Sequence, residues 1–254
     1  MACLPCVPVT MALKPHQIQP PPPAVTTNAP DVAHQKIYRV AVEREFTPLI
    51  VPGEQGRVTG FEADVLEAVG NEQGFGVEFL PMDWQQVFPQ LDEGNVDVAG
   101  SGIIMTEERL QKWDFSDPFI VAKYAVVVPT DSTITKSEDL RDKRVAVQPD
   151  SAFAEFARSK ANDIMDTKTI WMSIKAVITK EADAAMVNTV IAEHFVAKYP
   201  NEVKVVAFTN DADIPLGYAL KKGNGELQAQ INEGLAKIKA SGEYDKLKAK
   251  WDIK

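Results

Sequence analysis

The chain has 254 residues, of which 45% are hydrophobic and 25% are charged, with a formal net charge of −9. This composition is ordinary for a globular protein of one large or two medium domains. The acidic balance argues against nucleic acid or an anionic membrane surface as the main partner, since both favour a basic face. No run of about 18 apolar residues occurs, so we expect no membrane-spanning segment. A small molecule is the expected partner.

The first 35 residues differ in composition from the rest. They contain both cysteines, eight of the 17 prolines and almost no charge. Four consecutive prolines at 20–23 favour an extended polyproline segment, so we expect a disordered Pro-rich leader over residues 1–35. Cys3 and Cys6 have the spacing of a redox pair but lack the strand-to-helix context that activates a thiol. No export signal is readable, because prolines interrupt the apolar stretch and a basic start is missing.

From Lys36 onward the chain alternates strand-like and helix-like segments. Helical patterns ending at a glycine occupy residues 61–74 and 84–94. Strand-length apolar runs, rich in valine, lie at residues 38–42, 77–80, 96–100, 124–128, 144–147, 182–187, 203–208 and 217–220. Buried strands separated by helices predict an α/β fold with helices on both faces of the sheet.

Two turn-rich passages divide this series. The first follows the strand that ends near Pro129, and the second covers residues 207–215; two amphipathic helices, split at Gly242, then close the chain. Two crossings imply two lobes, so we expect lobe 1 to contain residues 36–128 and 211–254, and lobe 2 residues 129–210. A ligand would lie in the cleft between them, at the hinge.

An arginine placed just after a buried strand is the first candidate site residue. The strand predicted at 96–100 runs into Ser101 and Gly102, where small residues let a ligand approach the backbone. Thr106 can cap the short helix that follows, and Arg109 lies on its first turn. A guanidinium there presents paired donors that match a carboxylate. Pairing with a nearby aspartate, Asp114 or Asp117, is an equally open interpretation.

The stretch MTEERLQKWDFSDPF, residues 105–119, resembles the signature of the family 3 bacterial extracellular solute-binding proteins, the polar-amino-acid receptors of ABC importers. The resemblance covers about residues 36–254. It implies two α/β lobes of the periplasmic-binding-protein type, joined by two crossovers and closing around a solute. Further matching segments are VAVEREFTPLIV, GRVTGFEADVLEAVG, SEDLRDKRVAVQPDSAFAEF, EADAAMVN and the closing helices from residue 217.

The resemblance also implies roles for individual residues. Arg109 corresponds to the arginine that grips the α-carboxylate of the ligand. The remaining positions that correspond to ligand contacts are the aromatic walls Phe46 and Trp84, the acid Glu45 for a side-chain cation, the strand-end contacts Ser101 and Gly102, and the helix N-terminal hydroxyl of Ser151. Each of three residues also has an interpretation without a ligand: Ser151 as a plain N-cap, Trp84 as a core tryptophan and Glu45 as a solvated glutamate.

Three positions depart from the family pattern. Asn188 stands where an aspartate usually pairs with the ammonium group of the ligand, and an amide brings no charge to compensate a desolvated cation. Ile104 replaces a hydroxyl side chain that contacts the ligand, and Asp150 replaces a glycine beside Ser151. We therefore hypothesise a small carboxylate without the usual ammonium, or an amino acid in a shifted pose.

The resemblance implies further expectations about partners and location. We expect a monomer that binds a carboxylate-bearing solute and docks on the permease of an ABC importer, in the periplasm or at the cell surface, with no cofactor and no metal. A few proteins with this fold are cyclohexadienyl dehydratases, whose chemistry needs a general acid. The candidate acids are Glu45, Asp150 and Glu193, and His194 stands alone. A ligand-sensing receptor module is the third possibility.

Overall fold

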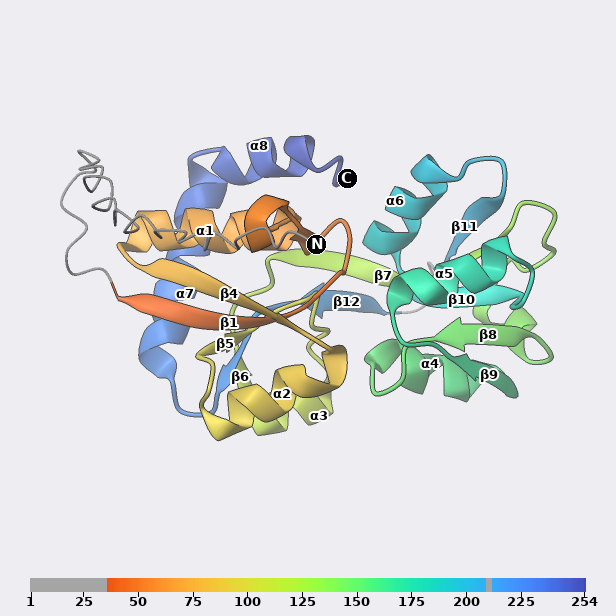
Figure 1. Ribbon diagram of the computed structural model, residues 1–254, viewed down its shortest axis with the longest axis horizontal. Coiled ribbons are helices and arrows are strands. Elements are labelled where there is room, and N and C mark those ends of the chain that lie inside the picture. The colour runs from red at the N-terminus through yellow and green to blue at the C-terminus, as the bar shows by residue number, and fades with distance from the viewer. Residues whose placement is uncertain (1–35, 209–211) are drawn as a thin grey trace, which may run out of the picture. The chain divides into compact units, whose positions relative to one another are not determined.

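The computed structural model describes residues 36–208 and 212–254. The predicted leader over residues 1–35 lies outside the described residues, and so do residues 209–211, where the second predicted boundary falls. Residues Gln35–Lys254 form one compact unit. It contains two main sheets, which belong to the two lobes in Figure 1. The prediction of a two-lobed α/β fold is confirmed.

The first sheet has five strands in the order β4-β1-β5-β13-β6. Strand β1 runs parallel to β4 and β5, whereas β13 is antiparallel to β5 and β6. The strands are β1 (Ile37–Glu43), β4 (Gly76–Met82), β5 (Val98–Ala99), β6 (Trp113–Phe115) and β13 (Ala219–Lys221). Alternate residues of β1 enter two different cores, Val40 and Val42 on one side and Ala41 on the other. A strand buried on both faces is apolar at nearly every position.

Helices cover both faces of this first sheet. Helix α1 (Phe61–Gln73) packs against α7 (Gly225–Ala240) and α8 (Glu243–Lys250), and helix α2 (Trp84–Glu93) packs against the other core, which contains Ala41. The short helix α3 (Glu107–Lys112) follows β5. Gly74 and Gly94 end α1 and α2 in the left-handed conformation, with φ of 75° and 76°. The glycine endings predicted from the sequence are therefore confirmed.

The second sheet has the strand order β11-β7-β10-β8-β9, with β12 paired to the early part of β7. Helices α4 (Ala152–Lys160), α5 (Ile170–Ile178) and α6 (Thr189–Lys198) pack against it. The strands are β7 (Ile120–Pro129), β8 (Arg144–Val147), β9 (Asp163–Asp166), β10 (Ala184–Asn188), β11 (Val203–Ala207) and β12 (Asp213–Leu216). Strands β8 and β10 are parallel, so their carboxyl ends meet at one edge of the sheet.

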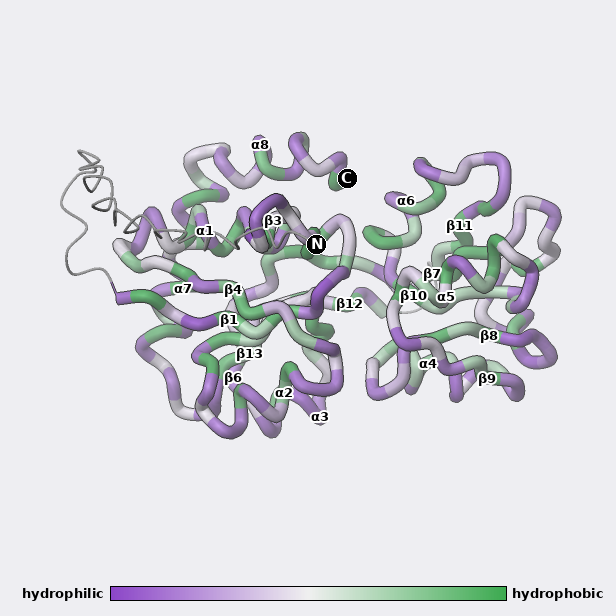
Figure 2. Tube along the Cα trace, in the orientation of Figure 1, coloured by the Kyte–Doolittle hydropathy of each residue, from purple (hydrophilic) through white to green (hydrophobic). Residues whose placement is uncertain are grey.

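Short elements complete the described fold. They are the hairpin strands β2 (Val51–Pro52) and β3 (Val58–Thr59) and the single-turn helices η1 (Glu54–Gly56) and η2 (Ser137–Leu140). Each of the eight predicted apolar runs contains residues of an observed strand. Hydrophobic residues follow the central strands of both lobes in Figure 2, while the loops are mostly polar. Within the described residues, no helix combines the length and the apolarity that a bilayer crossing requires.

The lobes are joined by strand pairing as well as by chain crossings. Residues 120–123 of β7 pair with β12, whereas residues 124–129 pair with β10 and β11 of the second sheet. The segment 124–128, which we expected in lobe 1, therefore belongs to the second sheet. The physical reason is that β7 continues unbroken from the crossing into that sheet, so the crossing lies before residue 124.

Candidate functional site

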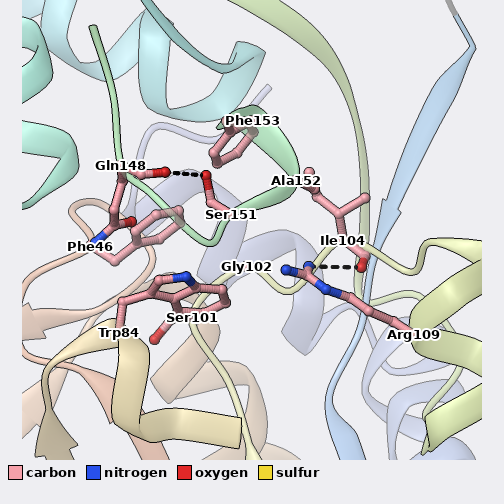
Figure 3. A pocket seen from close by; sticks show the side chains of 10 residues that line it. All are labelled: Phe46, Trp84, Ser101, Gly102, Ile104, Arg109, Gln148, Ser151, Ala152 and Phe153. Atoms are coloured by element: carbon pink, nitrogen blue, oxygen red, sulfur yellow. Dashed lines mark hydrogen bonds between the residues drawn. The ribbon is translucent and has the colours of Figure 1, made fainter. Parts of the chain in front are cut away.

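A pocket between the lobes gathers most of the predicted site residues (Figure 3). It holds about 260 Å³ of space, including solvent at its mouth. We call it the Arg109 pocket, and it is lined by Phe46, Trp84, Ser101, Gly102, Ile104, Arg109, Gln148, Ser151, Ala152 and Phe153. Seven of the nine predicted residues are among them.

Arg109 brings the only charged side chain to this lining. Thr106 caps α3 by accepting a hydrogen bond from the Arg109 backbone N–H at 3.3 Å, and Arg109 Nη1 donates to the Ile104 carbonyl at 3.1 Å. The guanidinium carbon lies 5.1 Å from the centre of the Phe88 ring and 5.7 Å from that of Trp84. Burial lowers the pKa of the guanidinium, but an arginine remains a cation.

The alternative interpretation of Arg109 as half of an ion pair has no support in the described residues. Asp114 pairs with Lys222 at 3.1 Å and accepts the Gly223 N–H at 2.7 Å. Asp117 makes no ion pair in this part of the chain, and its N–H donates to Asn232. The remaining guanidinium donors are therefore free of carboxylate partners among residues 36–208 and 212–254.

The loop after β5 is held from behind by a buried acid. Glu62 of α1 accepts the backbone N–H of Ser101 at 2.8 Å and of Gly102 at 2.7 Å. Both loop residues have positive φ, 90° and 60°. The predicted backbone contacts therefore need correction, because these two N–H groups point to Glu62 and are not available to a solute. The Ser101 hydroxyl accepts the Glu43 N–H at 2.7 Å.

Burial governs the ionisation of Glu62. It raises the pKa of the Glu62 carboxyl to about 7, while the hydrogen bonds from Gly102 and Ser101 favour the carboxylate. Tyr218 donates its hydroxyl proton to the Glu62 backbone carbonyl at 2.8 Å. This acid thus ties α1, the loop after β5 and the segment before β13 together.

The second lobe contributes the start of α4. Ser151 is its N-cap: the hydroxyl accepts the Ala154 N–H at 3.1 Å and donates to the Gln148 carbonyl at 2.6 Å. The cap interpretation of Ser151 is confirmed, although the residue also lines the pocket. Asp150 adopts the left-handed conformation, with φ of 59°, and its side chain is exposed outside the lining. Its carbonyl accepts the Trp84 indole N–H across the lobes at 3.0 Å.

Two predicted site residues lie outside the Arg109 pocket. Asn188 is 0% exposed and caps α6, with Oδ1 accepting the Ile191 N–H at 3.0 Å; its buried Nδ2 has no partner in the described residues. Glu45 is exposed and lines a neighbouring space. The chain leaves strand β1 after Glu43, so the glutamate at position 45 points away from the buried edge of the sheet.

That neighbouring space, which we call the Glu45 pocket, also lies between the lobes. It is lined by Glu43, Arg44, Glu45, Met82, Asp83, Trp84, Lys168, Thr169, Trp171 and Met172. Lys168 and Asp83 approach to 3.8 Å across it. Trp84 lines both pockets.

Sequence reasoning missed Gln148, Ala152, Phe153 and the buried acid Glu43. Gln148 Nε2 donates to Glu43 Oε1 across the lobes at 2.6 Å. Burial raises the pKa of Glu43 to about 7, and its Oε2 is buried with no partner in the described part of the chain. The available signal was positional, because each polar side chain comes at or directly after the end of a buried strand, as Ser101 does.

The candidate catalytic acids do not line the Arg109 pocket. Glu45 and Asp150 are exposed, and Glu193 forms an ion pair with Lys254 at 3.6 Å. His194 is half-buried, and burial lowers its pKa. Within residues 36–208 and 212–254, no group of three or more His, Cys, Asp or Glu side chains could hold a metal ion.

Comparison with known proteins gives consistent matches over nearly the whole described chain. Residues 38–253 match the bacterial extracellular solute-binding proteins, family 3. A probable histidine-binding protein of Neisseria gonorrhoeae is 31% identical over 232 residues, which are 89% of this chain and 87% of that protein.

Solved structures agree with the sequence comparison. An ancestral arginine-binding protein bound to glutamine has a TM-score of 0.79 and 33% identity, and covers 87% of this chain and 100% of its own. An ancestral amino-acid-binding protein described as a precursor of cyclohexadienyl dehydratase has a TM-score of 0.77 and 34% identity, with 85% and 95% covered.

Proposed function

The chain belongs to the family 3 bacterial extracellular solute-binding proteins, and we propose that it captures a small carboxylate-bearing solute, an amino acid or a related organic acid, for an ABC importer. The relatives named above bind amino acids according to their descriptions. In this proposal the protein works outside the cytoplasm, in the periplasm or at the cell surface, and delivers its solute as a monomer to a membrane permease.

The observation that carries the proposal is the state of Arg109. Its guanidinium is partly buried against Trp84, Phe88 and the Ile104 carbonyl, and no carboxylate in the described residues forms an ion pair with it. A buried cation costs free energy unless it is paired. A solute carboxylate supplies that pairing with two parallel hydrogen bonds. Phe46 and Trp84 then cover the apolar part of the solute.

Closure of the lobes fits the same proposal. Two hydrogen bonds join the lobes. Trp84 Nε1 donates to the Asp150 backbone carbonyl, and Gln148 Nε2 donates to Glu43 Oε1. A solute that contacts both Arg109 and the start of α4 binds the closed form more tightly than the open form. This difference in affinity shifts the protein toward the closed form.

Thermal unfolding of the purified protein against common amino acids and small keto and hydroxy acids tests the proposal. A solute at 100 times its dissociation constant stabilises the folded state by about 2.7 kcal/mol. Arg109→Ala should abolish the shift. Lys112→Ala is the matched control, because Lys112 lies on the same helix but is exposed and paired with Glu108 at 2.6 Å. Retention of the shift in Arg109→Ala would remove Arg109 as the anchor.

We propose a binding protein and not a lyase, because none of the three candidate acids lines the Arg109 pocket. Glu43, the buried acid at its edge, is hydrogen-bonded to Gln148. Incubation of the purified protein with prephenate or arogenate, followed by detection of released carbon dioxide, tests this choice. Turnover of either compound by the wild type, abolished by Glu43→Gln, would make a lyase the preferred function.

A further inference from the structure

The Arg109 pocket and the Glu45 pocket are separated by two side chains that meet across the lobes. Gln148 follows the end of β8 and is 2% exposed, and Glu43 ends β1 and is 3% exposed. Gln148 Nε2 lies 2.6 Å from Glu43 Oε1. Gln148 lines the Arg109 pocket, whereas Glu43 lines the Glu45 pocket. The hydrogen bond therefore lies on the boundary between the two spaces.

Further hydrogen bonds hold the Gln148 side chain and the backbone of both residues in place. Gln148 Nε2 also donates to the Lys168 carbonyl at 3.3 Å, and the Gln148 carbonyl accepts the Ser151 hydroxyl at 2.6 Å. On the other lobe, the Glu43 N–H donates to the Ser101 hydroxyl. The boundary is thus held from both lobes when they are closed.

Trp84 completes the boundary, since its ring lines both pockets and its indole N–H is bound to the Asp150 carbonyl. Figure 3 shows Gln148 and Arg109 on opposite sides of the Arg109 pocket. A solute whose carboxylate lies at Arg109 therefore extends toward Gln148. The Glu45 pocket is the larger space, about 770 Å³ including solvent at its mouth, against about 260 Å³.

We propose that the Gln148–Glu43 pair sets the maximum length of the solute, so that Gln148 is a specificity-determining residue. The inference rests on the proposed function, because it takes Arg109 as the carboxylate anchor. The preferred solutes are carboxylates with a short apolar chain. A longer chain must break the pair and enter the Glu45 pocket, or prevent the lobes from closing.

The test is a length series measured by isothermal titration calorimetry. The probes are unbranched α-amino acids, from alanine through norvaline and norleucine to 2-aminooctanoic acid, together with the matching 2-hydroxy acids. Extra methylene groups in a filled site are strongly disfavoured, so the affinity of the wild type should fall about ten- to hundredfold from the best short member to the longest.

Two variants at one position separate volume from hydrogen bonding. Gln148→Gly and Gln148→Leu both remove the bond to Glu43, but only the first removes the side-chain volume. The glycine variant should bind the longest members as tightly as the short ones, while the leucine variant should keep the decline with length. Thermal unfolding without solute checks that both variants are folded.

Three results would overturn the proposal. The first is a wild type that binds long and short members with equal affinity. This result can be obtained without any variant, and it leaves Arg109 as the anchor. The second is a pair of folded variants with the same length dependence. The third is a folded wild type that binds no member of either series. The proposed function fails separately, only if the wider panel of common amino acids and small organic acids also gives no shift in thermal unfolding, so the two failures are distinguishable.

Discussion

Replacing Glu43 by glutamine should remove a pH dependence from the stability of the protein. Burial is the main cause that raises the pKa of Glu43 from 4.5 to about 7; Asp83 and Glu45 add to it, and the Gln148 hydrogen bond opposes it. The folded state therefore takes up a proton at Glu43 between these two values. The wild type gains stability as the pH falls through this window and has lost that gain above about pH 7.

The two pKa values give the magnitude. For a single group that titrates at 4.5 when unfolded and at about 7 when folded, the ionised form destabilises the protein by about 3 kcal/mol at pH 8 and by about 1 kcal/mol at pH 5. Nearby Arg44 and Lys168 also line the Glu45 pocket, and both are present in the wild type and in the variant. The carboxamide in Glu43→Gln does not titrate and still offers an oxygen to Gln148.

Urea unfolding of wild type and Glu43→Gln at both pH values measures this difference. The variant should be more stable than the wild type by about 3 kcal/mol at pH 8, and this advantage should shrink to about 1 kcal/mol at pH 5. Glu62, whose pKa is also raised to about 7, is present in both proteins, so its contribution cancels. A stability difference that is the same at the two pH values would refute the reasoning.

Three further substitutions give distinct expected results. Asn188→Asp should leave the calorimetric affinity ratio between α-amino acids and the matching 2-hydroxy acids unchanged, since Asn188 is fully buried outside the Arg109 pocket; a roughly tenfold gain for the amino acids would show that a carboxylate at position 188 reaches the ammonium group of the solute. Glu62→Gln removes a second buried carboxyl whose pKa is raised to about 7, so the stability of the variant relative to the wild type in urea unfolding should increase as the pH rises from 5 to 8; a relative stability that does not change with pH would contradict this. Trp84→Phe should weaken solute binding about fivefold through loss of the bond to Asp150; equal affinity would show that this bond adds nothing to closure.

Local sequence patterns determined most elements of the fold. Valine-rich runs, glycine stops and amphipathic stripes are properties of short segments, so the eight apolar runs, the helices that end at Gly74 and Gly94, and the two closing helices were predicted correctly, whereas the short strands β6, β9 and β12 were not predicted. The sheet to which a strand belongs is not a local property. In β7, residues 120–123 and 124–129 are similarly apolar, yet they pair with strands from different parts of the chain.

The burial of side chains near strand ends also could not be predicted from the local sequence. Glu43 and Glu45 are separated by one residue, and both follow an apolar run. Pairing of β1 with β4 extends to Glu43 opposite Met82 and then stops, so the first glutamate is buried and the second is exposed. The register of β4, which lies more than 30 residues away, decides which acid reaches the site. No pattern within the stretch itself contains that information.

Asn188 and Gln148 show what local rules reveal and what they omit. An asparagine between a strand and a helix is a strong N-cap candidate, and the Asn188 side chain does cap α6, a role that we did not assign from the sequence. Gln148 has no such local role. Its amide becomes significant only because the second lobe brings it to Glu43. A hydrogen bond that exists only across two lobes can limit the solute only when the lobes are closed, so length discrimination at Gln148 should appear in the dissociation rate, which follows closure, more than in the initial encounter.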